Sequence, residues 1–224
     1  RDLHLSIRRQ RQMCIRDRLW DKGLIYQGQK VMPVSAALET VLANFEATSN
    51  YKDVQDPAVT VLFRLADDDA YIAAWTTTPW TLPSNLALCV GADIDYVCVI
   101  DGESGRRIYL AEARLPEYSD RHELTVETRL KGSDLEGKKY LPLFDYFVEE
   151  SGRGAFVVVA DDYVTTDEGT GIVHQAPAFG EDDYRVLQAH GIDAFACPVT
   201  MGGRFTDEVA DFAGTRVKDA DRDI

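Results

Sequence analysis

Residues 57–90 read PAVTVLFRLADDDAYIAAWTTTPWTLPSNLALCV, and with them the chain changes from polar to strand-like. Apolar and polar residues alternate along 58–65, and a second apolar run covers 70–78. Three aspartates at 67–69 separate these two runs, and a third run follows at 86–90. Alternation with a period of two is typical of half-buried strands, and acidic breaks are typical of turns. The segment therefore predicts short strands joined by turns.

The same texture continues toward the C-terminus. We predict further strands at 95–100, 107–111, 124–130, 154–160 and 169–176, and helices at 111–118 and 181–190. Gly191 is expected to end the second helix. Many short strands with Gly and Asp between them are the signature of a barrel or sandwich. The prediction is a β-rich α+β fold, with one barrel-like domain and flanking helices.

The two ends of the chain are less regular. Residues 19–32 suggest the end of a helix, a stop at Gly23 and a short strand, whereas 201–224 are polar and loop-like. Residues 1–18 hold six arginines and two aspartates and show no strand or helix period. Basic arms can be nucleic-acid tails. The irregular sequence favours a non-native or disordered arm instead.

Composition limits the possible functions. The chain has 224 residues, 45% of them hydrophobic, and a formal net charge of −14. This charge argues against nonspecific nucleic-acid binding, so any RNA must be held by local basic patches or by another domain. The sequence shows no apolar run long enough to cross a membrane and no secretory signal, which favours a cytosolic protein. We interpret the four scattered cysteines as reduced packing residues: Cys14, Cys89, Cys98 and Cys197.

A first candidate motif reads WTTTPWTLPSN and runs from Trp75 to Asn85. Three threonines end a predicted strand, and two prolines turn the chain away from the sheet. In a strand, Thr76 and Thr78 share one face and Thr77 takes the other. Such a corner leaves hydroxyl and backbone N–H groups free to meet a ligand. The alternative is that threonine is simply common in strands.

A second motif, residues 169–184, reads GTGIVHQAPAFGEDDY. Gly169 and Gly171 permit close approach of the backbone to another group. The three acids at 181–183 fall in the first turn of a predicted helix, where the helix dipole stabilises negative charge by about 0.3–1 kcal/mol. They can all be capping acids, or one of them can bind a cationic group such as an α-ammonium. His174 can likewise be an ordinary structural histidine.

Together, the two motifs resemble the editing domain of isoleucyl-tRNA synthetases. The valyl and leucyl relatives tend to carry Arg where this chain has Thr78. The resemblance extends over nearly everything from 19 to 224, and one departure is Val34, where the family often has an aromatic residue. It implies a distorted β-barrel editing domain of the valyl/isoleucyl/leucyl type. The implied limits are 19–56 for the connection from the catalytic domain, 57–200 for the editing domain and 201–224 for the return connection.

The resemblance also implies a reaction, the hydrolysis of wrongly attached valine from isoleucine tRNA. A hydrophobic pocket rejects a substrate that lacks one methylene by only roughly 1–3 kcal/mol, a range whose standard example is isoleucyl-tRNA synthetase facing valine. The family therefore uses a second sieve that admits valine and excludes isoleucine. The implied partners are the valine-carrying 3′ end of isoleucine tRNA and the catalytic domain of a parent synthetase. No membrane is implied, and a monomer is expected.

The family's residue roles carry over onto matching positions. Asp183 would pair with the α-ammonium of the amino acid, and His174 would form a wall against a longer side chain. Asn85 would hold the corner or touch the substrate, and Trp75 would be a packing neighbour in the substrate site. The other implied site residues are Thr76, Thr77, Thr78, Gly169, Thr170 and Gly171. Editing is expected to need no metal, cofactor or covalent nucleophile.

The family's two ATP-binding signatures, His-Ile-Gly-His and Lys-Met-Ser-Lys-Ser, do not occur in the chain. We therefore expect no amino-acid activation here, and ATP and Mg would be needed only by a full-length enzyme. Three alternatives stay open. They are a valyl- or leucyl-type editing domain, a non-catalytic module that holds an aminoacyl-tRNA end without turnover, and a stable fragment without activity.

Overall fold

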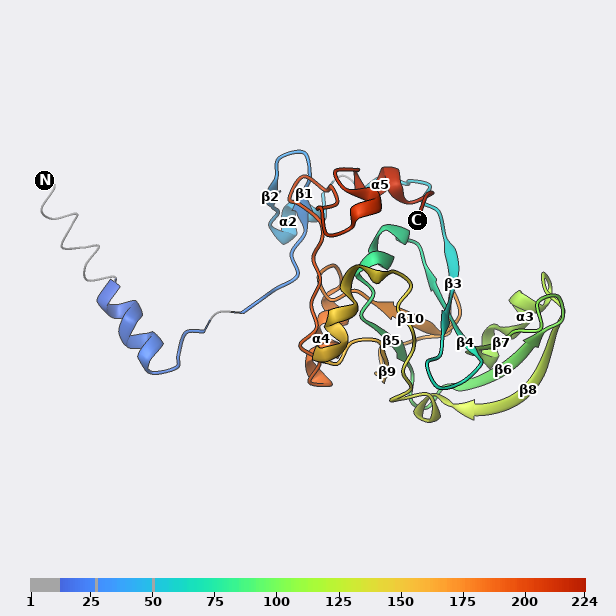
Figure 1. Ribbon diagram of the computed structural model, residues 1–224. Helices are drawn as coiled ribbons and strands as arrows, with labels where there is room; N and C mark the ends of the chain where they lie inside the picture. Colours follow the sequence, from blue (N-terminus) through green and yellow to red (C-terminus); the bar gives the residue numbers. More distant parts are fainter. Residues whose placement is uncertain (1–12, 27, 50) are drawn as a thin grey trace, which may run out of the picture. The chain divides into compact units, whose positions relative to one another are not determined.

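The computed structural model describes residues 13–26, 28–49 and 51–224 (Figure 1). Residues 1–12, 27 and 50 lie outside the described part, and they include most of the arm predicted at 1–18. The chain divides after Lys30 into two compact units, residues 1–30 and 31–224.

In the first unit, residues 13–21 form a helix. Gly23 ends it as predicted, with φ of +65° and a hydrogen bond from its N–H to the Trp20 carbonyl oxygen at 2.8 Å. The short strand expected before residue 33 is absent from the described residues, which is a correction. A strand needs a neighbour to satisfy its backbone groups, and no described segment pairs with this one.

The second unit is built mainly of short strands in three sheets. The five-stranded sheet has the order β3-β4-β7-β6-β8, the three-stranded sheet has the order β10-β5-β9, and β1 pairs with β2 (Figure 1). The bounds are β1 (Val34–Ser35), β2 (Thr40–Val41), β3 (Val59–Arg64), β4 (Tyr71–Thr76), β5 (Ala87–Val90), β6 (Asp95–Asp101), β7 (Arg107–Ala111), β8 (Leu124–Lys131), β9 (Val157–Ala160) and β10 (Ile172–Gln175).

All the strands predicted between 57 and 176 are present, and two of them, β9 and β10, begin three residues later than predicted. The expected strand at 154–160 begins only at Val157, because Gly154 and Phe156 have φ of +92° and +63°. Such left-handed backbone does not continue a strand. Gly169 and Gly171 shorten β10 in the same way, with φ of +64° and +71°.

Helical turns connect and flank the sheets. The predicted helix at 181–190 is confirmed as α4, and Gly191 follows it with φ of +66°. Three 3-10 segments, η1, η4 and η5, were not predicted, and neither was α5, which with η5 lies in the tail predicted to be loop-like. The bounds are α2 (Asn44–Ala47), η1 (Pro79–Ser84), η2 (Glu112–Arg114), α3 (Leu115–Ser119), η3 (Gly132–Asp134), η4 (Asp145–Arg153), α4 (Glu181–Ala189), η5 (Ala210–Phe212) and α5 (Val217–Ala220).

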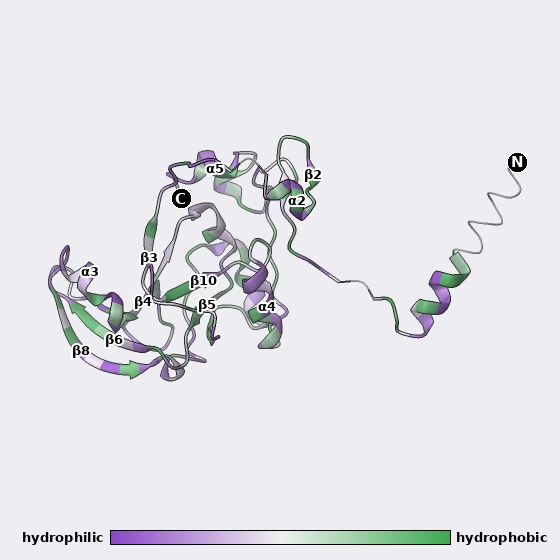
Figure 2. Ribbon diagram, turned by 180° about the vertical axis from the view of Figure 1, so that it is seen from behind, coloured by the Kyte–Doolittle hydropathy of each residue, from purple (hydrophilic) through white to green (hydrophobic). Residues whose placement is uncertain are grey.

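The core lies around the three-stranded sheet. All four residues of β5 are buried, because β10 and β9 flank this strand and side chains cover both of its faces. The hydropathy colours follow this arrangement: β5 is green, whereas β8 alternates between green and purple (Figure 2). A strand that alternates in this way has one face in the protein and one in solvent. The expected mixed α+β class is confirmed.

The described structure also bears on the predictions about membrane segments and cysteines. None of the helices in the described ranges is both long and apolar enough to span a membrane. All four cysteines are free, and Cys89 and Cys98 are buried as expected. Cys14 and Cys197 are exposed, so the packing role predicted for these two is wrong.

One buried hydroxyl joins two loops of this core and allows a stability prediction. Tyr96, fully buried, donates from its hydroxyl to the Gly171 carbonyl oxygen at 2.7 Å and accepts from the Gly91 N–H at 3.0 Å. We expect Tyr96→Phe to lower the free energy of unfolding by about 1–3 kcal/mol, because it leaves two buried backbone groups unpaired. Urea unfolding measures this change. In Tyr184→Phe, where the lost hydroxyl has no hydrogen bond in the described structure, stability should hardly change.

Candidate active site

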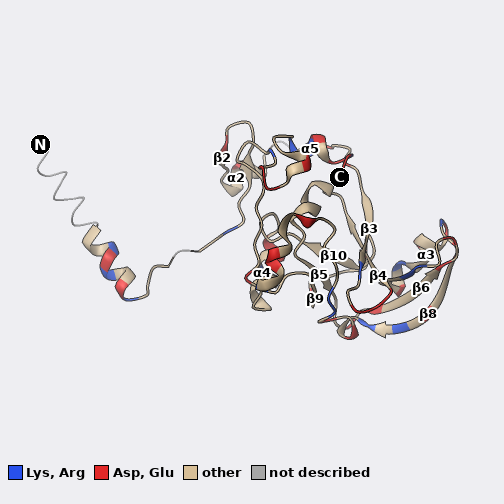
Figure 3. Cartoon of the chain, viewed as in Figure 1, with Lys and Arg blue, Asp and Glu red and all other residues tan. Residues whose placement is uncertain are grey.

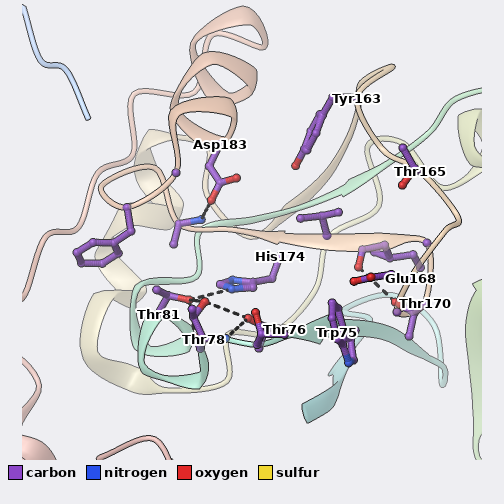
Figure 4. Close-up of a pocket in the computed structure, with 18 of the residues that line it drawn as sticks. Trp75, Thr76, Thr78, Thr81, Tyr163, Thr165, Glu168, Thr170, His174 and Asp183 are labelled. Carbon is purple, nitrogen blue, oxygen red and sulfur yellow. Dashed lines mark hydrogen bonds between the residues drawn. The ribbon is translucent and has the colours of Figure 1, made fainter. Parts of the chain in front are cut away.

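The two sequence motifs meet in the wall of one cavity of about 660 Å³ (Figure 4). This volume lies in the range of small-ligand sites, about 300–1,000 Å³. The first motif contributes Trp75, Thr76, Thr77, Thr78 and Thr81, the second contributes residues 169–174, Ala176, Phe179, Gly180 and Asp183, and a loop between β9 and β10 contributes Tyr163, Thr165, Asp167 and Glu168. Side chains far apart in the sequence therefore share one site.

The threonine corner forms where β4 ends. Pro79 cannot extend the strand and begins the turn η1, so the chain bends directly after the three threonines. Thr76 and Thr78 lie on the same side as predicted, with their hydroxyl oxygens 3.3 Å apart, and the Thr78 N–H donates to the Thr76 oxygen at 3.1 Å. Thr77 is exposed at the cavity rim. The corner thus presents a short row of hydroxyl groups.

Thr81 extends this row to His174. Its hydroxyl donates to the Thr78 carbonyl oxygen at 2.8 Å, and its oxygen lies 3.0 Å from His174 Nε2 (Figure 4). Because the single hydroxyl hydrogen is used toward Thr78, His174 Nε2–H must be the donor to Thr81. His174 Nδ1 is then a buried acceptor, and it has no partner among the described residues. Thr81 was not among the predicted site residues, although it lies inside the quoted motif.

His174 is a neutral part of the cavity wall. It lies in β10 opposite Leu88 of β5, and its side chain is only 7% exposed. Burial lowers the pKa of His174 from 6.5 to about 4, because the charged imidazolium would lose its hydration. At neutral pH this ring adds shape and hydrogen-bonding capacity to the cavity without adding a positive charge.

Asp183 is the acid of the α4 first turn that lines the cavity. The first turn of α4 is acidic (Figure 3). Glu181 and Asp182 are exposed, and Asp182 pairs with Arg185 at 3.3 Å. Asp183 Oδ2 accepts from the Ala176 N–H at 2.9 Å and has no salt bridge in the described structure. Burial raises the pKa of Asp183, and the bond from Ala176 partly opposes this rise. A desolvated carboxylate of this kind is well suited to a cationic ligand group.

The glycines of the second motif allow its backbone to pack tightly. A Cβ on Gly169 would lie 2.9 Å from the Trp75 side chain, and one on Gly171 would lie 2.5 Å from the Ala111 Cβ. The Thr170 carbonyl oxygen accepts from the Ala111 N–H at 2.9 Å. These three residues therefore line the cavity mainly through backbone that is held against β4 and β7.

Asn85 lies outside the cavity. It is buried, donates to the Ala87 carbonyl oxygen at 2.9 Å and accepts from the Tyr140 hydroxyl at 2.6 Å. Of the two roles expected for Asn85, these bonds suit the one of holding the corner. Asn85 does not line the cavity, so from this position it would not contact a ligand there.

The loop between β9 and β10 lines another part of the cavity, and its residues were not among the predicted site residues. Tyr163 receives a hydrogen bond from Gln175 Nε2 at 2.6 Å, and the Arg185 guanidinium lies 5.8 Å from its ring centroid. Arg185 is held in turn by two bonds to Asp161, at 2.9 and 3.0 Å. In the sequence, residues 161–168 read DDYVTTDE and resemble an ordinary polar loop, so no local signal could have identified them.

The chemistry of the cavity follows from its contents. It offers the half-buried carboxylate of Asp183, the exposed carboxylates of Asp167 and Glu168, a row of hydroxyl groups, a neutral imidazole and close-packed backbone. A ligand with a cationic amine would meet Asp183, and polar oxygens of the same ligand would meet the threonine hydroxyls. The site therefore suits a small molecule, or the end of a larger one, that carries an amine close to a carbonyl group.

The chain is similar to known proteins along most of its length. A family model described as tRNA synthetases class I (I, L, M and V) matches residues 8–190. The cytoplasmic isoleucine–tRNA ligase of Mus musculus is 52% identical over 212 residues, which cover 92% of this chain and 17% of the mouse protein. The isoleucine–tRNA ligase of Bdellovibrio bacteriovorus is 52% identical over 209 residues, covering 92% of this chain and 20% of that protein. The chain spans about a fifth of the length of these relatives.

Two solved structures share the fold. The crystal structure of GlLeuRS-CP1 matches with a TM-score of 0.58 and 17% identity, covering 75% of this chain and 93% of that one. The cytosolic leucyl-tRNA synthetase editing domain of P. knowlesi matches with a TM-score of 0.51 and 13% identity, covering 59% of this chain and 60% of that one. At these identities the likeness concerns the fold alone.

Proposed function

Because this chain belongs to the class I tRNA synthetases (I, L, M and V), we propose that its cavity is an editing site that hydrolyses valine wrongly attached to isoleucine tRNA. The observation that carries the proposal is that Asp183, His174 and the threonine corner line a single cavity. The 52% identity to two isoleucine–tRNA ligases supports isoleucine tRNA as the substrate, and valine as the amino acid that is removed from it. Thr78, where the valyl and leucyl relatives tend to have Arg, supports the same choice.

In the proposed reaction, water adds to the ester carbonyl and the ribose oxygen of the terminal adenosine leaves. Asp183 binds the α-ammonium of valine and so fixes the position of the ester. Thr76 and Thr78 hydrogen-bond the attacking water and the developing oxyanion, and positioning of this kind supplies much of the rate. His174, neutral at pH 7, forms the wall that a longer side chain would strike.

The proposed partners are the 3′ end of isoleucine tRNA and the catalytic domain of a parent synthetase. We propose that the full-length enzyme is a monomer and that it uses ATP and Mg. Four basic side chains of the five-stranded sheet and of α4 are paired with carboxylates, so they offer little free positive charge to RNA. We therefore propose that most of the tRNA affinity comes from outside this chain. The pairs are Arg107–Glu127, Arg129–Glu112, Lys131–Asp95 and Arg185–Asp161.

The sheets that line the cavity support a more specific proposal about the fold. Thr76 of β4 and His174 of β10 come from different sheets, yet both line the cavity. We propose that these sheets together form the distorted barrel of an editing domain, with limits near 57 and 200. Residues 19–56 and 201–224 would then be the connections to and from a catalytic domain.

A deacylation assay with the 224-residue chain tests the function. We expect isoleucine tRNA charged with valine to lose its amino acid faster than the uncatalysed rate, and the same tRNA charged with isoleucine to be spared. Faster release of threonine from valine tRNA would favour a valyl-type site instead. Binding of the charged tRNA without any release of valine would identify a non-catalytic module.

A further inference from the structure

Gly180 stands directly beside the carboxylate of Asp183. A Cβ built on Gly180 would lie 2.6 Å from Asp183 Cγ, 2.6 Å from Oδ2 and 2.9 Å from Oδ1. Non-bonded carbon and oxygen atoms do not approach this closely, because contact distances are about 3.5–4.0 Å. The space that a side chain at 180 would need is therefore the space that this carboxylate occupies.

The backbone of Gly180 does not itself require glycine. Its φ of −118° and ψ of 130° lie in the extended region that every residue adopts. This distinguishes Gly180 from Gly169 and Gly171, whose positive φ values favour glycine regardless of space. Gly180 is also the N-cap residue of α4, a position where serine stabilises a helix at least as well as glycine does.

We infer that Gly180 is a positioning residue, and that its missing side chain leaves Asp183 free to accept the Ala176 N–H and to face the cavity. The inference deepens the proposed function and rests on it for its catalytic consequence. Any side chain at 180 would push the Asp183 carboxylate off the Ala176 N–H, which it now meets at 2.9 Å. The amine site would then lose its alignment although Asp183 itself is still present.

Three variants separate this effect from a loss of helix stability. Gly180→Ala adds the Cβ and removes a good N-cap residue, whereas Gly180→Ser adds the same Cβ and supplies a capping hydroxyl. The control is Gly152→Ala, because Gly152 lies in η4 at an exposed position where an added Cβ meets nothing within 4 Å. If only helix capping mattered, the serine variant would behave like the original chain.

The first measurement does not depend on activity. In the original chain, the NMR shift of the Ala176 amide should follow the titration of Asp183, because that amide donates to the carboxylate. We expect Gly180→Ala, Gly180→Ser and Asp183→Asn to abolish this titration, and Gly152→Ala to keep it. An Ala176 amide that still titrates normally in Gly180→Ser would overturn the inference, whether or not the chain deacylates tRNA.

The second measurement uses catalysis and isolates amine recognition. Isoleucine tRNA is charged either with valine or with 2-hydroxy-3-methylbutanoate, the analogue that carries a hydroxyl in place of the ammonium. We expect the Gly180 variants to lose on the order of 10- to 100-fold of the preference for valine, the range for one hydrogen bond to a charged group. An inactive original chain would refute the proposed function and leave the Ala176 result standing. An active original chain with an unchanged preference in both Gly180 variants would refute the positioning role.

Discussion

Asp183→Asn should reduce kcat/KM for the deacylation of valyl isoleucine tRNA by about 10²- to 10⁴-fold. Removing one member of a buried charge pair costs about 3–5 kcal/mol, and each 1.36 kcal/mol corresponds to tenfold in rate. Asparagine keeps the size of the side chain and an oxygen that accepts from Ala176. The expected loss therefore reports the missing negative charge rather than a disturbed α4.

The same substitution should leave the free energy of unfolding unchanged or slightly higher at pH 7. Burial raises the pKa of Asp183 in the folded protein, so the ionised carboxyl is less favourable there than in the unfolded chain. Above both pKa values the folded state carries this penalty, and neutral asparagine does not. Loss of activity without loss of stability is the behaviour expected of a binding residue. Thermal unfolding and deacylation measured on one sample test the combination.

A pH profile gives a second reading of the same residue. Only ionised Asp183 binds an ammonium, so kcat/KM should fall as the pH is lowered through a midpoint above the ordinary value of 3.8. Asp183→Asn should lack this midpoint. A fall through the same midpoint in Asp183→Asn would contradict this role of the carboxylate.

The matched control is Asp182→Asn, which makes the same change of charge one residue away. Asp182 is exposed, pairs with Arg185 and does not line the cavity. Its substitution should leave deacylation within about twofold, because exposed ion pairs contribute about 1 kcal/mol or less. Equal losses in the two variants would mean that the helix terminus, and not the Asp183 carboxylate, carries the effect.

The strands could be predicted from the sequence because their signal is local. The alternation in β3 lies within a single run of six residues, and the aspartates that follow mark the turn. The left-handed Phe156 that delays β9 has no such signal, since phenylalanine rarely adopts positive φ. Its conformation comes from tertiary structure, in which its N–H donates to the Leu86 carbonyl oxygen at 2.7 Å.

The candidate site was predictable only in part, for a related reason. Asp183 stands three and four residues before Val186 and Leu187, which are fully or almost fully buried, so helical spacing places it on the inner face of α4. That pattern is readable in the sequence. The bond between Thr81 and His174 joins residues 93 positions apart, and Tyr163 enters from a polar loop. Neither feature has a signal in the local sequence, so both could be identified only from the structure.

His174→Ala should allow the editing site to release correctly attached isoleucine from isoleucine tRNA. Removal of the buried imidazole opens the cavity wall, so the extra methylene of isoleucine no longer meets an obstacle. We expect the ratio of kcat/KM for valine over isoleucine to fall by at least about tenfold, the lower end of what a pocket gains from one methylene. Side-by-side deacylation of the two charged tRNAs measures this ratio.

Stability has to be separated from specificity in this test. His174 is only 7% exposed, and replacing a large side chain with alanine in a core commonly destabilises a protein by about 2–5 kcal/mol. His174→Gln fills more of the space and keeps an N–H that can donate to Thr81, so it should fold normally and widen the cavity only slightly. Graded isoleucine release, in the order alanine, glutamine, histidine, would show that the wall acts by shape. If both folded variants still spare isoleucine, the discriminating wall is built by other residues of the cavity.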